Sequence, residues 1–299
     1  MVKNKPKVSI ILPVYNGVKT LKTTLNSICN QTFQDFELVC CIDGSKDGSE
    51  SLLWSFQNKI KNLKIIRNFE NLGLGATMNR LMANTQGEYV AIAEQDDYYY
   101  PERLELQVEV LDSRTDVGLV SGISEFWDGK KVVTKFPGIL LSGKQYPIGK
   151  EMFLLNYRKQ IKVVNSCTMI RKSVHIDNGL YFSKHYPSIS VDWSYILRFS
   201  MVSKIYGIHK PLVRLDRRIN RESVTSNKEK QFLASRQLLA SFRYEYPNIV
   251  TNKDYQYALN TQLIMELNHM PFVKYVIRFG INILTRPMDR RFFHSLQKK

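Results

Sequence analysis

Hydrophobic and polar positions follow a regular order along the first 122 residues. Short apolar runs, which are typical of buried strands, lie at residues 7–13, 36–42, 63–67, 88–93 and 117–122. Between these runs the apolar residues recur every three or four positions, as at Leu21, Leu25 and Ile28, and this spacing predicts helices. Strands that alternate with helices of about ten residues predict an α/β fold with a mostly parallel sheet, covered by helices on both faces.

Acidic residues follow two of the predicted strands. Asp43 ends the second strand, and Asp96 and Asp97 follow the fourth. Ligands of such sheets bind at the carboxyl ends of the strands, so we expect these carboxylates to share one polar site. The segment from Asp43 to Ser49 holds two glycines and two serines, which predicts a tight turn near a ligand with Ser49 as a helix cap. Ordinary turn chemistry explains this segment equally well when it is taken alone.

The acids between Glu94 and Asp97 form a candidate metal site. Adjacent carboxylates repel each other unless solvent or a cation compensates their charge. A Mg²⁺ or Mn²⁺ ion that holds a diphosphate needs only one or two such oxygens, and Asp96 is the favoured ligand. The alternative is that these acids only precede a helix, whose positive end favours negative charge. The five histidines form no pair with ligand spacing, so we expect no zinc site.

Composition and charge narrow the function classes. The chain has 299 residues, of which 43 are Lys or Arg and 27 are Asp or Glu, for a formal net charge of +16. This excess indicates an anionic partner: a nucleic acid, a phosphorylated small molecule or an acidic membrane surface. No GxxxxGK[ST] motif occurs, and the segment GLGATM has Met78 in place of the third glycine of a dinucleotide fingerprint. A dinucleotide-dependent oxidoreductase is therefore disfavoured.

Cysteine usage and segment lengths bear on the compartment. The four cysteines lack CxxC spacing, and two of them lie in an apolar run, which favours small buried thiols in a reducing setting. The basic N-terminus leads directly into a strand, without the apolar region of a signal peptide. No apolar run reaches the roughly 18 residues that span a bilayer. We therefore expect a cytoplasmic protein.

Five segments, in this order, resemble the family 2 glycosyltransferases. They are VSIILPVYNG, DFELVCCIDGSKDGS, NLGLGATMNRL, GEYVAIAEQDDYYYPERL and VDWSYILR. The likeness is continuous from about residue 6 to residue 122 and returns in pieces to about residue 225. The resemblance implies the GT-A fold and an inverting transfer of a sugar from a nucleotide-diphosphate donor, with a UDP-sugar favoured, to a hydroxyl acceptor. A glycan or lipid-linked acceptor, in polysaccharide or glycolipid synthesis, is the implied context.

The resemblance assigns the donor site by position. It implies that Pro13 and Tyr15 line the nucleotide pocket and that Asp43 bonds the base. Asp96 matches the last acid of the family's metal-binding DxD motif, and Glu94 stands where the first Asp is usual. Glu94 is therefore the second, less certain ligand of Mg²⁺ or Mn²⁺. Its longer side chain leaves open whether it binds the ion directly or through a water.

The acceptor side is assigned by the segment SVDWSYILR. Asp192 starts a predicted helix there and matches the acid of the family's ED segment, which implies the catalytic base that deprotonates the acceptor hydroxyl. The alternative is an aspartate that only caps the helix. Three arginines further along could bring positive charge to the diphosphate, or could form only an exposed basic loop. They are Arg217, Arg218 and Arg221.

The chain is expected to fall into two regions. Residues 1–225 form the GT-A catalytic domain, in which 1–122 bind the nucleotide sugar and 123–225 bind the acceptor. Residues 226–299 form a helical, basic C-terminal extension. Helical patterns occur in it at 232–246 and 255–270. The basic, aromatic segment after them fits an anionic membrane surface, which would place the protein peripherally on the inner face of a membrane. A helix that packs over the catalytic domain is an equal alternative.

Two other function classes are kept open. Glu94, Val191 and Asn220 depart from the family pattern, where Asp, Glu and a frequent His are usual. An inactive member that serves as a nucleotide-sugar or glycan-binding scaffold is therefore the main alternative. A basic nucleic-acid-binding protein would explain the net charge, but a sheet face with interleaved aromatic and basic residues is not evident. We therefore expect no nucleic acid partner.

Overall fold

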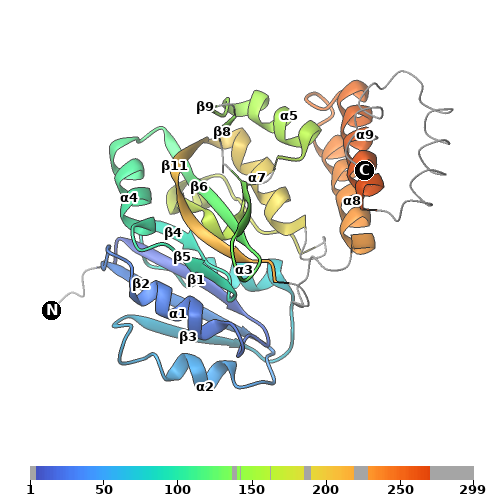
Figure 1. Cartoon of the computed structure of the whole chain (residues 1–299). Coiled ribbons are helices and arrows are strands. Elements are labelled where there is room, and N and C mark those ends of the chain that lie inside the picture. The colour runs from blue at the N-terminus through green and yellow to red at the C-terminus, as the bar shows by residue number, and fades with distance from the viewer. Residues whose placement is uncertain are drawn as a thin grey trace. The chain divides into compact units, whose positions relative to one another are not determined.

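The protein divides into two compact units. A computed structural model describes residues 5–136, 140–141, 143–161, 163–184, 190–218 and 228–269. The first unit is Met1–Phe153 with Lys162–Ser226, and the second is Leu154–Ile161 with Asn227–Lys299. Figure 1 shows the order of the elements along the chain.

The first unit is built on one mixed, curled sheet. Its strand order is β3-β2-β1-β4-β10-β6-β11-β5, with β7 paired to β6. The strands are β1 (Val8–Val14), β2 (Phe36–Asp43), β3 (Leu63–Asn68), β4 (Tyr89–Ile92), β5 (Asp97–Tyr99), β6 (Val117–Trp127), β7 (Val132–Phe136), β10 (Met169–Arg171) and β11 (Lys204–Asp216). A separate two-stranded sheet joins β8 (Leu140–Leu141) to β9 (Lys144–Gln145). The α/β class and the five predicted strands are confirmed, and β1 to β4 are parallel as expected.

The helices of this unit cover the sheet and connect its strands. They are α1 (Leu21–Cys29), α2 (Ser49–Trp54), α3 (Leu74–Ala83), α4 (Arg103–Ser113), the start of α5 (Gly149–Lys159), the short helix η1 (Asn165–Cys167), α6 (Lys172–Asp177) and α7 (Val191–Val202). On one face of the sheet, Ile10 and Leu12 of β1 join Leu25 of α1 in one hydrophobic cluster. On the other face, α3 packs on β1 and β2 and buries Met78 and Leu81 completely. Burial on both faces explains why these strands read as unbroken apolar runs.

The sheet curls between β4 and β5. Only residues 93–96 separate these strands in the chain, yet β10, β6 and β11 lie between them in the sheet. β5 pairs antiparallel with β11 and is also held by α1, since the Thr24 hydroxyl donates to the Asp97 carbonyl at 2.7 Å. The acid-rich stretch therefore occupies the bend of the sheet.

Three local features differ from the expectations. β5 and β10 have three residues each, too short to stand out as periodic patterns, and β10 runs antiparallel between β4 and β6. Ser49 does not cap α2, whose N-cap is Gly48. The first backbone N–H of α2, that of Ser49, is instead satisfied by the Asp47 carboxylate, which accepts from it at 3.0 Å and also accepts from the Ser49 hydroxyl. The Ser49 hydroxyl is thereby free to accept from the Gly17 N–H at 2.8 Å.

The second unit contains α8 (Lys228–Glu245), α9 (Asn252–Asn268) and the end of α5. The two helical patterns predicted there are confirmed. Thr251 and Asp254 form a capping box at the start of α9, and the Asp254 carboxylate also pairs with Arg158 of α5. The Tyr157 hydroxyl donates to the Leu239 carbonyl at 2.7 Å. The basic segment after residue 269, with the membrane contact predicted for it, lies outside the described residues. Among the residues that are described, no helix combines the length and apolar character needed to cross a bilayer.

A buried histidine joins α6 to α7. Nδ1 of His175 lies 2.9 Å from the Tyr195 hydroxyl, and the Tyr195 ring stacks on Phe182 with centroids 4.2 Å apart. Burial, followed by the positive charge of Lys172, lowers the pKa of His175 to about 4. A histidine that titrates near 6.5 when unfolded must therefore stay neutral in the folded protein at neutral pH.

This pKa shift predicts a loss of stability in mild acid. Because the unfolded chain binds the proton more readily, the free energy of unfolding should fall by about 2 kcal/mol between pH 7 and pH 5 on account of His175. Urea unfolding of the wild type and of His175→Gln at both pH values measures this. The free energy of unfolding of the variant should fall by about 2 kcal/mol less than that of the wild type between the two pH values. An equal fall in both proteins would contradict the assignment of this pH dependence to His175.

Candidate active site

The loop after β1 ties two other strand ends together. On one side, Gln95 bonds both backbone groups of Tyr15, each at 2.9 Å. On the other side, the Asn16 N–H donates to Ser45 Oγ at 3.0 Å, in the loop after β2. β2 and β4 flank β1 in the sheet, and neighbouring strands lie about 4.8 Å apart, so these strand ends are about 10 Å from each other. Asp43 and the acids that follow β4 are thus held at the same edge of the sheet.

The Asp43 carboxylate is buried and anchors the next loop. Its Oδ1 accepts from the Asn68 side chain at 2.7 Å and from the Leu72 N–H at 2.9 Å, and its Oδ2 accepts from the Gly73 N–H at 3.2 Å. A carboxylate offers about four acceptor positions, so these bonds leave about one for a ligand. Gly73 has a φ of +81°, which glycine adopts without strain, and α3 begins directly after it. Asp43 therefore also positions the start of α3.

Three acids gather in the bend between β4 and β5. One carboxylate oxygen from each of Glu94, Asp96 and Asp97 lies within 4.8 Å of the others. Asp97 is 1% exposed and accepts a hydrogen bond from the Ser166 hydroxyl. Burial, followed by the negative charge of Glu94, raises the pKa of Asp97 well above its ordinary value. Negative charge on the buried Asp97 beside Glu94 is unfavourable, and three carboxylate oxygens are the kind of ligand that Mg²⁺ and Mn²⁺ prefer. The residues present therefore suit the predicted ion, and Asp97 joins the predicted pair of Asp96 and Glu94.

A buried arginine supports this acid cluster from inside. Arg103 is 2% exposed, and its guanidinium donates to the carbonyls of Ile92 at 2.8 Å and Thr168 at 3.1 Å. It also lies 4.5 Å from the ring centroid of Tyr99, whose hydroxyl accepts from the Glu94 N–H at 2.7 Å. The charge of Arg103 opposes the rise in the pKa of Asp97. The sequence interpretation missed this residue, although a polar pair four apart, Arg103 and Gln107, beside the apolar stripe of α4 was a usable signal.

Asp192 lies in the first turn of α7, as predicted. It is half-buried, and its Oδ1 accepts from the Trp193 N–H at 2.8 Å. Contacts join α7 to α3, because Phe182, which stacks on Tyr195, exchanges two hydrogen bonds of 2.8 Å with the side chain of Asn79. α7 is therefore connected, through Phe182 and α3, to the loop that Asp43 holds.

The remaining predicted positions take varied environments. Pro13 is half-buried near the end of β1, and Tyr15 is 48% exposed on the loop after it. Arg217 lies 4.6 Å from the Phe126 ring centroid, and its charge acts on Asp97. Arg218 pairs with Asp216. Asn220 and Arg221 lie outside the described residues.

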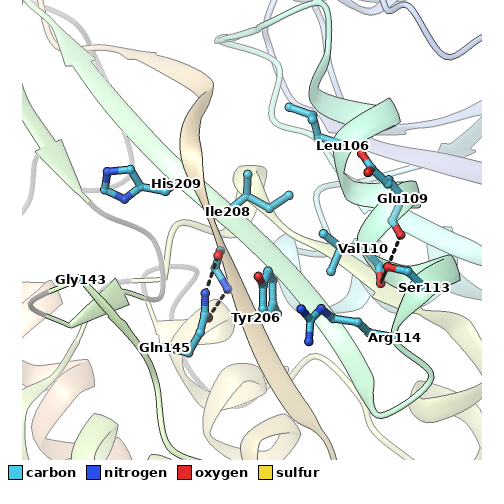
Figure 2. Close-up of a pocket in the computed structure, with 11 residues that line it drawn as sticks. Leu106, Glu109, Val110, Ser113, Arg114, Gly143, Gln145, Tyr206, Ile208 and His209 are labelled. Atoms are coloured by element: carbon cyan, nitrogen blue, oxygen red, sulfur yellow. Dashed lines mark hydrogen bonds between the residues drawn. The ribbon is translucent and has the colours of Figure 1, made fainter.

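A separate pocket of about 620 Å³ opens beside α4. Figure 2 shows Leu106 and Glu109 of α4 on one side of it and Tyr206 and Ile208 of β11 across from them. Leu215, further along β11, pairs with Asp97, and the seven positions from Ile208 to Leu215 span roughly 20 Å of strand. The pocket therefore lies apart from the acid cluster and is not the site described above.

Comparisons with known proteins agree on one family. The family model "Glycosyl transferase family 2" matches residues 9–179. Bacillus subtilis EpsE, which is named as a glycosyltransferase, is 30% identical over 185 residues, or 59% of this chain and 66% of that protein. An uncharacterized glycosyltransferase of Rickettsia typhi is 30% identical over 213 residues, or 70% of this chain and 63% of that protein. The matches thus span about two thirds of the length of these relatives.

Solved structures share the fold at low sequence identity. S. aureus TarS 1-349 in complex with UDP has a TM-score of 0.63 at 22% identity, over 79% of this chain and 65% of that chain. The mannosyltransferase PcManGT from Pyrobaculum calidifontis, in complex with GDP-Man and Mn²⁺, has a TM-score of 0.57 at 14% identity, over 98% of this chain and 83% of that chain. The predicted GT-A fold, with its C-terminal helices, is confirmed.

The buried arginine generates a stability prediction. Arg103→Met should lower the free energy of unfolding by about 3 kcal/mol or more, because it removes the hydrogen bonds to the carbonyls of Ile92 and Thr168 and one of the positive charges near the buried Asp97. Arg114→Met, at an exposed arginine that lies over the Tyr206 ring, is the matched control and should cost under about 1 kcal/mol. Urea unfolding of both variants measures the difference. Equal losses would show that Arg103 does not hold the acid cluster.

Proposed function

Because the chain belongs to glycosyl transferase family 2, we propose that it moves a sugar from a nucleotide-diphosphate donor to a hydroxyl acceptor with inversion. The observation that carries this proposal is the cluster of three carboxylates after β4, held at the same sheet edge as Asp43 by the loop that contains Tyr15. Synthesis of a polysaccharide or glycolipid is the proposed context.

We assign the metal site to Asp96 and Glu94, with Asp97 behind them. A bound Mg²⁺ or Mn²⁺ would neutralise the negative charge that develops on a diphosphate leaving group. The protein prepares the site before any ligand arrives, since the Ser166 hydroxyl, Arg103 and Tyr99 hold the bend in place. Binding of GDP-Man and Mn²⁺ by the structural neighbour PcManGT supports this reading.

The nucleotide is proposed to lie against the loop after β1. The Tyr15 ring is half exposed there, and Pro13 lies just before it. The fourth acceptor position of Asp43 suits an N–H group of a base, such as the imide of uracil. A UDP-sugar is favoured, and the UDP complex of the neighbour TarS supports that choice.

Asp192 is proposed as the catalytic base. Its carboxylate takes the proton of the acceptor hydroxyl, the freed oxygen bonds to the anomeric carbon, and the bond from that carbon to the diphosphate oxygen breaks. An in-line displacement requires the base and the leaving group on opposite sides of the sugar. Asp192 is carried by α7, an element separate from the acid cluster to which the diphosphate is assigned.

The two regions are proposed to divide the work. Residues 1–225 carry out the transfer, with 1–122 for the donor and 123–225 for the acceptor. Residues 226–299 form the extension that contacts an anionic membrane surface on the cytoplasmic side. The excess of positive charge over the whole chain supports this contact.

Donor binding should require a divalent ion. Titration of UDP-, GDP- and dTDP-sugars should show binding that strengthens at least tenfold with Mn²⁺ or Mg²⁺, and Asp96→Asn should abolish this gain because it removes a charged ligand. Asp116→Asn, at an exposed acid that pairs with Lys204, is the control and should bind as the wild type does. Isothermal titration calorimetry gives the affinities. Donor affinity of the wild type that does not change with the metal ion would contradict the proposed metal site.

Turnover should depend on Asp192 more than binding does. Asp192→Asn should release nucleoside diphosphate about 10² to 10⁴ times more slowly, because it cannot accept the proton, while donor affinity stays within about twofold. Asp177→Asn, at an exposed acid that ends α6, should keep wild-type turnover. A coupled assay of diphosphate release measures all three proteins. A wild type that binds donors tightly but turns none over would favour the scaffold alternative instead.

A further inference from the structure

Arg214 on β11 contacts two aromatic rings. The guanidinium carbon of Arg214 lies 4.7 Å from the ring centroid of Tyr98 on β5 and 5.0 Å from that of Trp127 on β6. The strand register fixes this arrangement, since Arg214 pairs with Tyr98 on one side and with Glu125 on the other. Contacts with ring faces restrain the plane of a guanidinium and leave its N–H edges free for hydrogen bonds.

The hydrogen-bonding capacity of Arg214 is unused by the rest of the described chain. Its guanidinium makes no hydrogen bond or ion pair with any residue that the structure describes, although it carries five N–H donors and is half-buried. Two acids whose pKa the charge of Arg214 helps to lower, Glu125 on β6 and Asp216 on β11 itself, already have other partners. Glu125 accepts from the Tyr100 hydroxyl at 2.6 Å and from Lys135 at 2.8 Å, and Asp216 pairs with Arg218.

Charge around this position favours an anion. The charged groups here are three cations and two acids, which leaves an excess of one positive charge. The cations are Arg214, Lys135 and Arg218, and the acids are Glu125 and Asp216. A planar guanidinium presents paired N–H groups that match two oxygens of a phosphate or a carboxylate. A guanidinium that two rings contact and that no described residue pairs is suited to an oxyanion more than to a neutral hydroxyl.

The arginine and the acid cluster occupy opposite faces of β5. Side chains alternate across a strand, and in β5 the buried Asp97 and Tyr99 alternate with the half-buried Tyr98. Arg214 lies over Tyr98, whereas Asp97 belongs to the acid cluster. An anion at Arg214 is therefore distinct from the diphosphate assigned to the acid cluster.

From these observations we propose that Arg214 forms an oxyanion subsite that binds a phosphoryl or carboxylate group of the sugar acceptor. The assignment to the acceptor rests on the proposed function, whereas the binding of an oxyanion does not. Tyr98 and Trp127 hold the guanidinium, and its N–H edge binds two oxygens of the anion. The acceptor is then an acidic molecule, either phosphorylated or carrying a uronic acid.

The subsite is tested with inorganic phosphate and with glucuronate as separate probes, at constant ionic strength. Tryptophan fluorescence reports binding, because Trp127 contacts the guanidinium. The wild type should bind at least one probe saturably, and the stronger of the two identifies the oxyanion. Arg214→Gln should weaken that binding at least tenfold. Arg114→Gln removes the same charge from an arginine that also lies over a tyrosine, and it should change binding less than twofold.

Two further measurements keep the outcomes separable. Arg214→Lys retains the positive charge but lacks the paired N–H groups of the guanidinium. It should therefore unfold at the wild-type temperature and bind the oxyanion probe several-fold more weakly. UDP-sugar affinity should be unchanged in Arg214→Gln. Equal weakening by the Arg114 and Arg214 variants, the absence of saturable binding in the wild type, or a loss of UDP-sugar affinity would each overturn the subsite. Oxyanion binding that depends on Arg214 in a protein that binds no sugar nucleotide would instead overturn the proposed function and leave the anion site standing.

Discussion

The close approach of three carboxylates in one bend of the sheet is the constraint that the rest of the site accommodates. Two of these acids are half-buried and Asp97 is almost fully buried, next to the charge of Glu94. Such an arrangement is unfavourable without compensation. The structure offsets it partly with the Ser166 hydroxyl and the charges of Arg103 and Arg217, and the remaining deficit is what a divalent cation can supply.

The curl of the sheet makes this arrangement possible. If the chain continued straight from β4, the acids would lie in solvent, and their mutual repulsion would keep them from gathering at one position. Here β5 turns back to pair with β11 and is held by α1, so Asp97 is buried while Glu94 and Asp96 stay half-buried. The same turn sets Tyr98 over Arg214 on the opposite face of β5. One bend in the backbone therefore brings together the three acids to which we assign a cation and, on the other face of β5, the arginine to which we assign an anion.

Hydrogen bonds link the two halves of the candidate active site. Asp43 holds the loop that begins α3, α3 holds Phe182 through Asn79, and Phe182 stacks against α7, which carries Asp192. Each step is a hydrogen bond or a ring stack within the first unit, so the loop at Asp43 and α7 are joined by a continuous series of contacts.

The sequence by itself determined the alternation of strands and helices, the family resemblance and the placement of Asp43, Asp96 and Asp192 at element ends, because these depend on local periodicity and on short ordered motifs. It could not show that β5 and β10 exist, since three residues carry no period, nor that Asp47 and not Ser49 caps α2. Only the tertiary structure decided which distant groups meet, as with Arg103 and the Thr168 carbonyl, or Arg214 between Tyr98 and Trp127. The physical reason is that burial and charge compensation are properties of the packed chain, in which residues far apart in sequence become neighbours.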